Sequence, residues 1–151
     1  ADALHLLGVV AHQKGLPDAA VALILDAIRL HPTAAAYHAN VAEAYRAKGD
    51  AAAAERHCRE ALRLQPDYPE ATVNLGLALR GLGRYEEAAR QFEAAIAKRP
   101  HWFLPYLHLG DLHLAAGRPY DATAVLREGV RLCGPHAALH ATFGRALLVT
   151  G

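Results

Sequence analysis

The stretch ATVNLGLALRGLGRYEEAARQFEAAIAKRP, residues 71–100, decides the fold of this chain. On either side of Gly83 its apolar residues recur with the three- and four-residue spacing of a helix. Nowhere do apolar and polar residues alternate as they do in a half-buried strand. Gly83 and Pro100 end the two segments. The stretch therefore predicts two helices joined by a short turn.

The residues that end these segments recur along the chain in steps of 34 residues, as from Gly49 to Gly83. Three residue types follow this step: glycine at Gly15, Gly49, Gly83, Gly117 and Gly151, alanine at Ala20, Ala54, Ala88 and Ala122, and proline at Pro32, Pro66 and Pro100. A fixed period of this length is the signature of a repeat array. The register predicts nine helices, over residues 1–14, 17–31, 35–48, 51–65, 68–82, 85–98, 103–116, 119–132 and 136–149.

The residues within each period resemble the tetratricopeptide repeat (TPR) family. A Leu-Gly pair stands in the first helix of three periods, at Leu7-Gly8, Leu75-Gly76 and Leu109-Gly110. The second helices carry a bulky residue followed by a small one, in the pairs Ile24 and Ala27, Cys58 and Ala61, Phe92 and Ala95, and Leu126 and Gly129. The alternation of bulky and small residues suits close packing of neighbouring helices.

The resemblance covers the whole chain and implies an all-α fold, a right-handed superhelical solenoid of antiparallel helix pairs. Four repeats, 1–34, 35–68, 69–102 and 103–136, are followed by a partial fifth over 137–151, and we expect them to form a single domain over 1–151. Members of the family are interaction scaffolds, so the resemblance implies a protein or peptide partner bound in the concave groove that the first helices line.

Composition narrows the classes of partner and compartment. Sixteen Lys and Arg residues nearly balance fifteen Asp and Glu residues, so the weak overall field does not favour nucleic acid. No apolar run reaches the roughly 20 residues that span a bilayer, and no signal peptide opens the chain. We therefore expect no membrane partner. The two cysteines have no spacing motif and fit a reducing compartment, so we expect a cytoplasmic protein. The chain contains no methionine, which leads us to expect a piece of a longer protein.

The resemblance also implies which residues line the groove. Asn40 and Asn74, one repeat apart, have amides that both donate to and accept from a peptide backbone, and Arg46 and Arg80 offer planar forks for carboxylates. The remaining candidates are Glu43, His12, Leu77, Leu107, His108 and Asp111. The alternative is that the amides satisfy helix ends or water, that the arginines only solvate the surface, and that Leu107 packs on the neighbouring repeat.

One subclass of the family is excluded by the residues at its binding places. Adaptors of heat-shock chaperones clamp a C-terminal carboxylate with Lys, Asn, Asn, Lys and Arg. The matching places here hold His5, Val9, Asn40, Glu70 and Asn74. Only the middle asparagine fits, and Glu70 would repel a carboxylate. We therefore do not expect a chaperone-tail adaptor.

Catalytic and metal-binding chemistry find little support. The chain has no serine, and neither Cys58 nor Cys133 has a base at helical spacing. The cysteines lie two repeats apart, too far for a disulfide. His136 and His140 are four residues apart on one helix, but no third metal ligand accompanies them. We expect no enzyme activity in this chain, no cofactor and no metal.

The two ends of the chain suggest two alternatives. The last predicted helix contains Leu139, Phe143, Leu147, Leu148 and Val149 with only Arg145 strongly polar, so we expect a homo-oligomer through this exposed C-terminal helix. The first segment, ADALHLLGVVAHQKG, resembles the opening of the repeat region in bacterial proteins similar to O-linked N-acetylglucosamine transferases. That resemblance implies a substrate-recognition arm of a larger glycosyltransferase.

Overall fold

The structure, a computed structural model, describes all residues, 1–151. It consists of nine helices with no strand: α1 (Asp2–Gln13), α2 (Pro17–Leu30), α3 (Ala35–Lys48), α4 (Ala51–Leu64), α5 (Pro69–Gly81), α6 (Tyr85–Lys98), α7 (Phe103–Ala115), α8 (Pro119–Cys133) and α9 (Ala137–Thr150). The all-α fold class is confirmed, and each predicted helix ends within one residue of the observed one. The right-handed winding and the single domain stay predictions.

The turn between α3 and α4 shows how the repeated glycine reverses the chain. Gly49 is the C-cap of α3 and has φ 89°, in the left-handed region that glycine tolerates. The backbone N–H of Asp50 then donates to the carbonyl oxygen of Tyr45 at 2.9 Å. The Asp50 side chain accepts from the N–H of Ala53 and so caps α4. Two residues therefore end one helix and begin the next.

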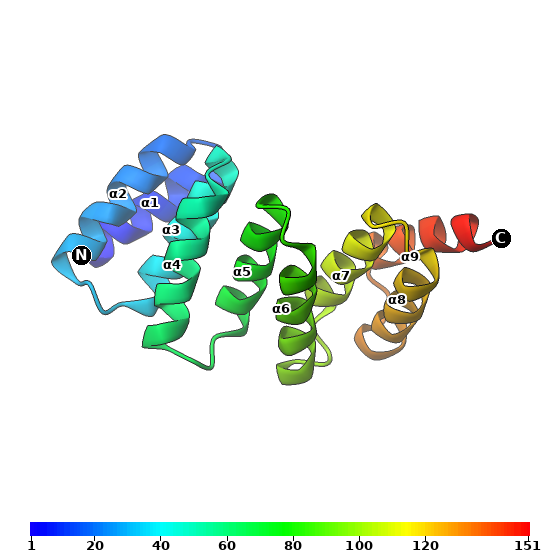
Figure 1. Cartoon of the computed structure of the whole chain (residues 1–151). Coiled ribbons are helices and arrows are strands. Elements are labelled where there is room, and N and C mark those ends of the chain that lie inside the picture. The colour runs from blue at the N-terminus through cyan, green and yellow to red at the C-terminus, as the bar shows by residue number, and fades with distance from the viewer. The chain divides into compact units, whose positions relative to one another are not determined.

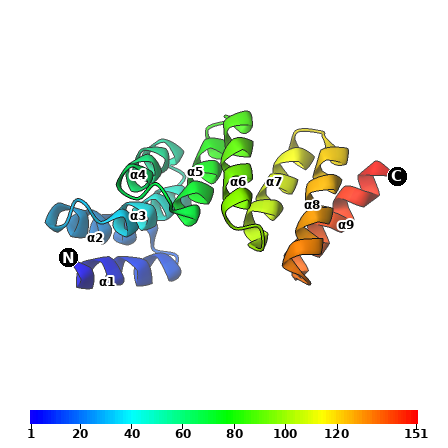
Figure 2. The same ribbon diagram turned by 90° about the horizontal axis from the view of Figure 1, so that it is seen from below.

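The helices gather into two compact units, Ala1–Arg84 with α1 to α5 and Tyr85–Gly151 with α6 to α9. In the first unit α1 packs on α2 and α3 on α4, while α5 lies beside α3 and α4 (Figure 1). In the second unit α7 packs on α8 and also contacts α6, and α9 lies against α7 and α8 (Figure 2). Within each unit the first helix of a repeat therefore packs on the second helix that follows it: α1 on α2, α3 on α4 and α7 on α8.

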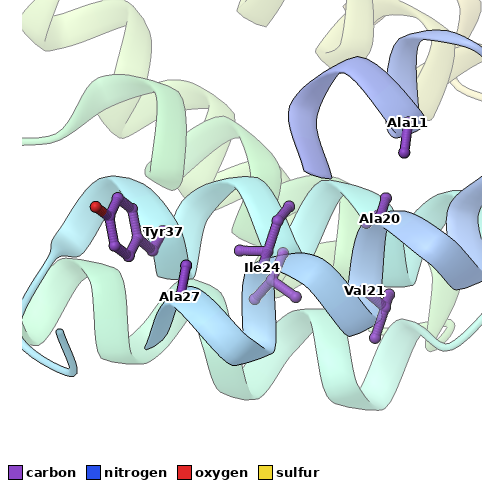
Figure 3. Close-up of a cluster of buried hydrophobic side chains, with 8 residues drawn as sticks. Ala11, Ala20, Val21, Ile24, Ala27 and Tyr37 are labelled. Carbon is purple, nitrogen blue, oxygen red and sulfur yellow. The ribbon is translucent and has the colours of Figure 1, made fainter. Parts of the chain in front are cut away.

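The core of the first unit is built where α1 crosses α2. Ile24 is fully buried, between Ala20 and Ala27 on its own helix (Figure 3). A Cβ atom placed on Gly8 of α1 would lie 2.4 Å from Cγ1 of Ile24. Only a glycine permits this approach, so the Leu-Gly pair sets how closely the two helices pack.

The second unit repeats this arrangement where α7 crosses α8. A Cβ atom on Gly110 would lie 2.6 Å from Cγ of Leu126. Three residues further along α8, a Cβ atom on Gly129 would lie 2.8 Å from Cβ of Tyr106. The Tyr106 hydroxyl donates to the carbonyl oxygen of Pro100 at 2.9 Å, which satisfies its polar end within the core. The predicted pairing of bulky and small positions is confirmed in both units.

Candidate binding face on the first helices

The predicted groove residues lie on four first helices. In the first unit, α1 neighbours α3 and α3 neighbours α5. This order brings seven candidates onto adjacent helices: His12 on α1, Asn40, Glu43 and Arg46 on α3, and Asn74, Leu77 and Arg80 on α5. The other three, Leu107, His108 and Asp111, lie on α7 in the second unit. Each unit therefore carries its own part of the candidate face.

Asn40 is held in place by a residue that sequence analysis did not assign to it. Its Nδ2 lies 2.7 Å from Nε2 of His5 on α1. The His5 ring stacks on Tyr37 with centroids 4.3 Å apart, and the Tyr37 hydroxyl donates to Asp2. Burial lowers the pKa of His5, so the imidazole is neutral and its Nε2 accepts from the Asn40 amide. The Oδ1 atom of Asn40 is left as the free acceptor.

Asn74 occupies the equivalent place one repeat later, on α5. It is half-buried, and its amide has no side-chain hydrogen bond within the chain. Both the donor and the acceptor of this amide therefore remain available to a ligand. Asn40 and Asn74 differ in this respect, since one amide is oriented by a neighbour and the other is not.

Two charged candidates of the first unit, Glu43 and Arg46, lie near the buried Cys58. Glu43 is half-buried and Arg46 is exposed. Burial raises the pKa of the Cys58 thiol to about 12, with Glu43 raising it further and Arg46 opposing the shift. Cys58 is fully buried, so its thiol packs in the core and is protonated at neutral pH. Arg80, on α5, is half-buried.

His12 and Leu77 offer less surface than their places in the repeat suggest. Leu77 is only 8% exposed, so it belongs to the packing of α5. His12 is half-buried, and its Nδ1 is buried without a hydrogen-bond partner. The polar part of the face in the first unit is therefore formed by Asn40, Asn74, Glu43, Arg46 and Arg80.

In the second unit Asp111 is already paired. Arg145 of α9 donates to its carboxylate at 2.7 Å and to Oγ1 of Thr142 at 2.8 Å. Leu107 is half-buried and packs against the core around Tyr106. The half-buried ring of His108 lies 5.6 Å from that of Phe92. Each of these three candidates on α7 therefore contacts other residues of the second unit.

Beside Arg145 lies an apolar hollow of about 540 Å³. It is lined by Leu114, Gly117, Pro119, Arg145, Leu148 and Val149. The two lining residues at the end of α9, Leu148 and Val149, are largely exposed. The hollow therefore suits an apolar side chain, whereas the first unit presents amides and charges.

The histidines do not assemble a metal centre. No group of three or more His, Cys, Asp or Glu side chains is placed to hold a metal ion. Nδ1 of His38 lies 3.1 Å from Nδ1 of His57, and Nε2 of His38 lies 3.0 Å from the Pro32 carbonyl oxygen. The ring of His136 stacks on Phe103. Both cysteines are free thiols, and none of the helices has the length and apolar character needed to cross a membrane.

Comparison with known proteins identifies the repeats. Residues 1–33, 32–100 and 73–138 each match the tetratricopeptide repeat family. A thermophilic TPR protein of Thermus thermophilus is similar in structure, with a TM-score of 0.85, 23% identity and alignment over 97% of this chain and 80% of that one. PilF of Pseudomonas aeruginosa has a TM-score of 0.84 and 23% identity over 97% of this chain and 67% of that one. These likenesses show an all-α helical-repeat fold.

Curated relatives are longer proteins. Protein O-mannosyl-transferase TMTC2 of Mus musculus is 33% identical over 81 residues, which make up 52% of this chain and 10% of that protein. The human protein of the same name is 32% identical over 81 residues, again 52% of this chain and 10% of that protein. The chain thus spans about a tenth of the length of these relatives.

Proposed function

Because the chain belongs to the tetratricopeptide repeat family, we propose that it is a non-catalytic scaffold that binds a peptide segment of a partner protein along its first helices. The family and the fold support a protein-interaction module. The proposal treats residues 1–151 as one domain that acts in the cytoplasm. Nucleic acid is not part of it, because sixteen basic and fifteen acidic residues give a weak overall field.

The observation that carries the proposal is the contrast between Asn40 and Asn74. The hydrogen bond that Nδ2 of Asn40 donates to His5 fixes the Asn40 amide, so that Oδ1 can accept from a peptide N–H. The Asn74 amide, one repeat further, is free to donate and accept. Two amides on neighbouring helices suit successive units of an extended backbone, and Arg46 and Arg80 suit an acidic side chain next to it.

The experiment starts from a random peptide library selected on the purified chain. The tightest selected peptide is then titrated against the Asn74→Ala variant, with Arg56→Ala on α4 as the matched surface control. We expect Asn74→Ala to weaken binding about tenfold or more at an unchanged thermal midpoint, because Asn74 has no internal hydrogen bond to lose. Failure to select any peptide, or equal binding by Asn74→Ala, would reject this function.

A second candidate is a substrate-recognition arm of a larger glycosyltransferase similar to O-linked N-acetylglucosamine transferases. The 81-residue similarity to Protein O-mannosyl-transferase TMTC2 favours it. Under this candidate the first helices select the protein substrate and a separate region transfers the sugar. The parent reading frame tests it, since a sugar-transferring domain must be encoded with these repeats.

A third candidate, self-association through α9, is favoured by its exposed apolar residues Leu147, Leu148 and Val149. It requires a mass that rises with protein concentration in sedimentation equilibrium. A constant monomer mass at the highest soluble concentration would dismiss it.

A further inference from the structure

A hollow between three helices of the second unit lies apart from the candidate binding face. It has a volume of about 480 Å³ and is lined by side chains of α6, α7 and α8 and by Pro100. The helices α6 and α8 each pack on α7 but not on each other (Figure 2). Helix α7 therefore forms the floor of this space, which we call the α7 hollow, and the two second helices form its walls.

The α7 hollow and the candidate binding face use different sides of α7. Tyr106, Leu109 and His113 line the floor, and their three- and four-residue spacing puts them on one side of the helix. Leu107 and Asp111 of the candidate face are four residues apart and share another side. A ligand in the α7 hollow therefore does not depend on the groove residues.

The hollow exists because a ring of the repeat is missing from its wall. In the first unit the ring of His57 on α4 stacks on those of Tyr45 and His38 on α3, with centroids 5.5 and 5.3 Å apart. Val125 of α8 stands two 34-residue steps after His57, and His113 stands two steps after Tyr45. The smaller side chains leave space above α7. Consecutive repeats flank this space on both sides, so its opening does not depend on the first or last residues of the chain.

Aliphatic side chains and two carboxylates line the α7 hollow. Ile96, Leu109 and Leu132 come from α6, α7 and α8 in turn. Glu93 stands on the α6 wall and Glu128 on the α8 wall. No lysine or arginine is among the lining residues. Such a lining suits a ligand that has an aliphatic part and a positive charge.

Glu93 is the carboxylate that has no counter-ion. Glu128 accepts two hydrogen bonds from Arg131, at 2.9 and 2.5 Å. Glu93 is exposed and has neither a hydrogen bond nor an ion pair within the chain. Burial lowers the pKa of His113 on the floor, and its Nδ1 has no hydrogen-bond partner. The floor therefore adds a neutral imidazole, and the charge of Glu93 stays unbalanced.

We propose that the α7 hollow binds a lysine side chain of a partner protein. The methylene groups of the lysine lie along Ile96 and Leu109, and its ammonium group reaches the solvent-exposed opening. There it donates to the carboxylate of Glu93. An aliphatic residue next to the lysine packs against Leu132 on the other wall.

A partner protein suits this site better than a free amine or a second copy of the chain does. Solvent and salt screen the attraction between the exposed Glu93 and a small amine, whereas the residues around a lysine add apolar contacts. The chain has three lysines, Lys14, Lys48 and Lys98. Lys48 pairs with Asp18 at 2.7 Å, and Lys98 also interacts within the chain. This leaves Lys14 as the lysine that a second copy offers, and a variant tests it.

The experiment titrates the intact chain, labelled with ¹⁵N, with a blocked peptide of the sequence glycine-leucine-lysine-leucine-glycine. One control peptide replaces the lysine by norleucine, which keeps the four-carbon side chain without the charge. Another replaces it by diaminopropionate, which keeps the ammonium group on a single methylene. We expect saturable amide shifts at Leu109 and Val125, with affinity about three- to fivefold weaker for norleucine and about tenfold weaker for diaminopropionate. Free n-butylamine, the side chain alone, should not saturate these shifts.

Two protein variants locate the site. Glu93→Gln removes the unbalanced charge, and Glu86→Gln, exposed on the same helix, is the matched control for net charge. We expect Glu93→Gln to weaken binding of the lysine peptide about three- to fivefold and Glu86→Gln to leave it unchanged. Val125→Phe puts a ring back on the wall and should abolish binding, while the helical circular dichroism of the parent chain is retained.

Several outcomes would overturn the proposal. Three of them are the absence of saturable binding, equal binding of the lysine and norleucine peptides, and equal binding by Glu93→Gln and the parent chain. Saturation by n-butylamine at the same concentrations would assign the hollow to free amines. A mass of the chain alone that rises with concentration, and that Lys14→Gln makes constant, would assign it to a second copy. Asn74→Ala should bind the lysine peptide as the parent does, so failure here leaves the groove proposal unaffected.

Discussion

The Asn40 amide of α3 donates to Nε2 of His5 on α1 across 2.7 Å. This bond requires a neutral imidazole whose proton is on Nδ1, and burial favours that form by lowering the pKa of His5. A protonated His5 would present an N–H at Nε2. The Asn40 amide would then have to turn over and offer Oδ1 to the ring, so that Nδ2 would replace Oδ1 as the atom available to a peptide.

We therefore predict that peptide binding at Asn40 depends on pH. Because the pKa of His5 in the folded chain is below its ordinary value of 6.5, affinity should be constant above pH 6.5 and fall as pH drops through the folded pKa. Titration of a selected peptide between pH 5 and 7.5 measures this. The His5→Gln variant keeps an acceptor that does not titrate, so its affinity for the peptide should not change with pH. The same pH dependence in His5→Gln would contradict the mechanism.

Gly110 and Gly144, two of the glycines at equivalent places of first helices, should respond differently to alanine. In Gly110→Ala the new Cβ atom must displace Leu126, whose Cγ would lie 2.6 Å away, and overpacking of this kind costs about 1–3 kcal/mol. In Gly144→Ala the Cβ atom meets nothing, and the gain in helix propensity is up to about 1 kcal/mol. In urea unfolding, the midpoint of Gly110→Ala should lie below that of the parent chain and the midpoint of Gly144→Ala above it.

The same residues show how much the sequence predicts. The 34-residue step predicts each helix to within one residue because Gly49 and its equivalents must take positive φ where a helix ends. The Leu-Gly pairs predict the contact of Gly8 with Ile24, since the repeat places a bulky residue at a constant position. Such features depend on the backbone, and the repeat register determines them.

The contacts made by polar candidates are harder to predict. The hydrogen bond between His5 and Asn40 and the ion pair between Asp111 and Arg145 join places 35 and 34 residues apart. The period predicts that the two residues of each pair lie on neighbouring first helices. It does not predict that their side chains turn toward each other, because rotamers depend on local packing and on tautomers. The repeat pattern therefore points to Asn40 and Asp111 but not to their partners, His5 and Arg145.

Asp50 should contribute to stability as the N-cap of α4. Its Oδ1 accepts from the N–H of Ala53 at 2.9 Å, and replacing such a cap by alanine costs about 1 kcal/mol. We expect Asp50→Ala to lower the thermal midpoint and Asp50→Asn, which keeps an acceptor oxygen, to restore most of it. If Asp50→Asn is as unstable as Asp50→Ala, charge and not capping explains the loss.

The contact between His38 and His57 should make the first unit sensitive to acid. Nε2 of His38 donates to the Pro32 carbonyl oxygen, so its Nδ1 accepts from Nδ1 of His57 at 3.1 Å. Burial, and then the neighbouring His38 and Arg56, lowers the pKa of His57 to about 4. The unfolded chain, with an ordinary value of 6.5, binds this proton at higher pH than the folded chain does. The contribution of His57 to the free energy of unfolding is therefore complete above pH 6.5 and is lost as pH falls toward 4.

Solvent reaches part of the His57 ring, so we expect acidification to lower the free energy of unfolding through this group by only about 1–2 kcal/mol. The measurement is urea unfolding of the parent chain and of His57→Gln at pH 7 and at pH 4.5. Other groups titrate in this range in both proteins, so the useful quantity is the difference between the two pH dependences. The parent chain should lose more stability on acidification than His57→Gln, since glutamine takes up no proton on unfolding. Equal losses would mean that His57 titrates alike in the folded and unfolded chains, and that its contact with His38 does not exclude a proton.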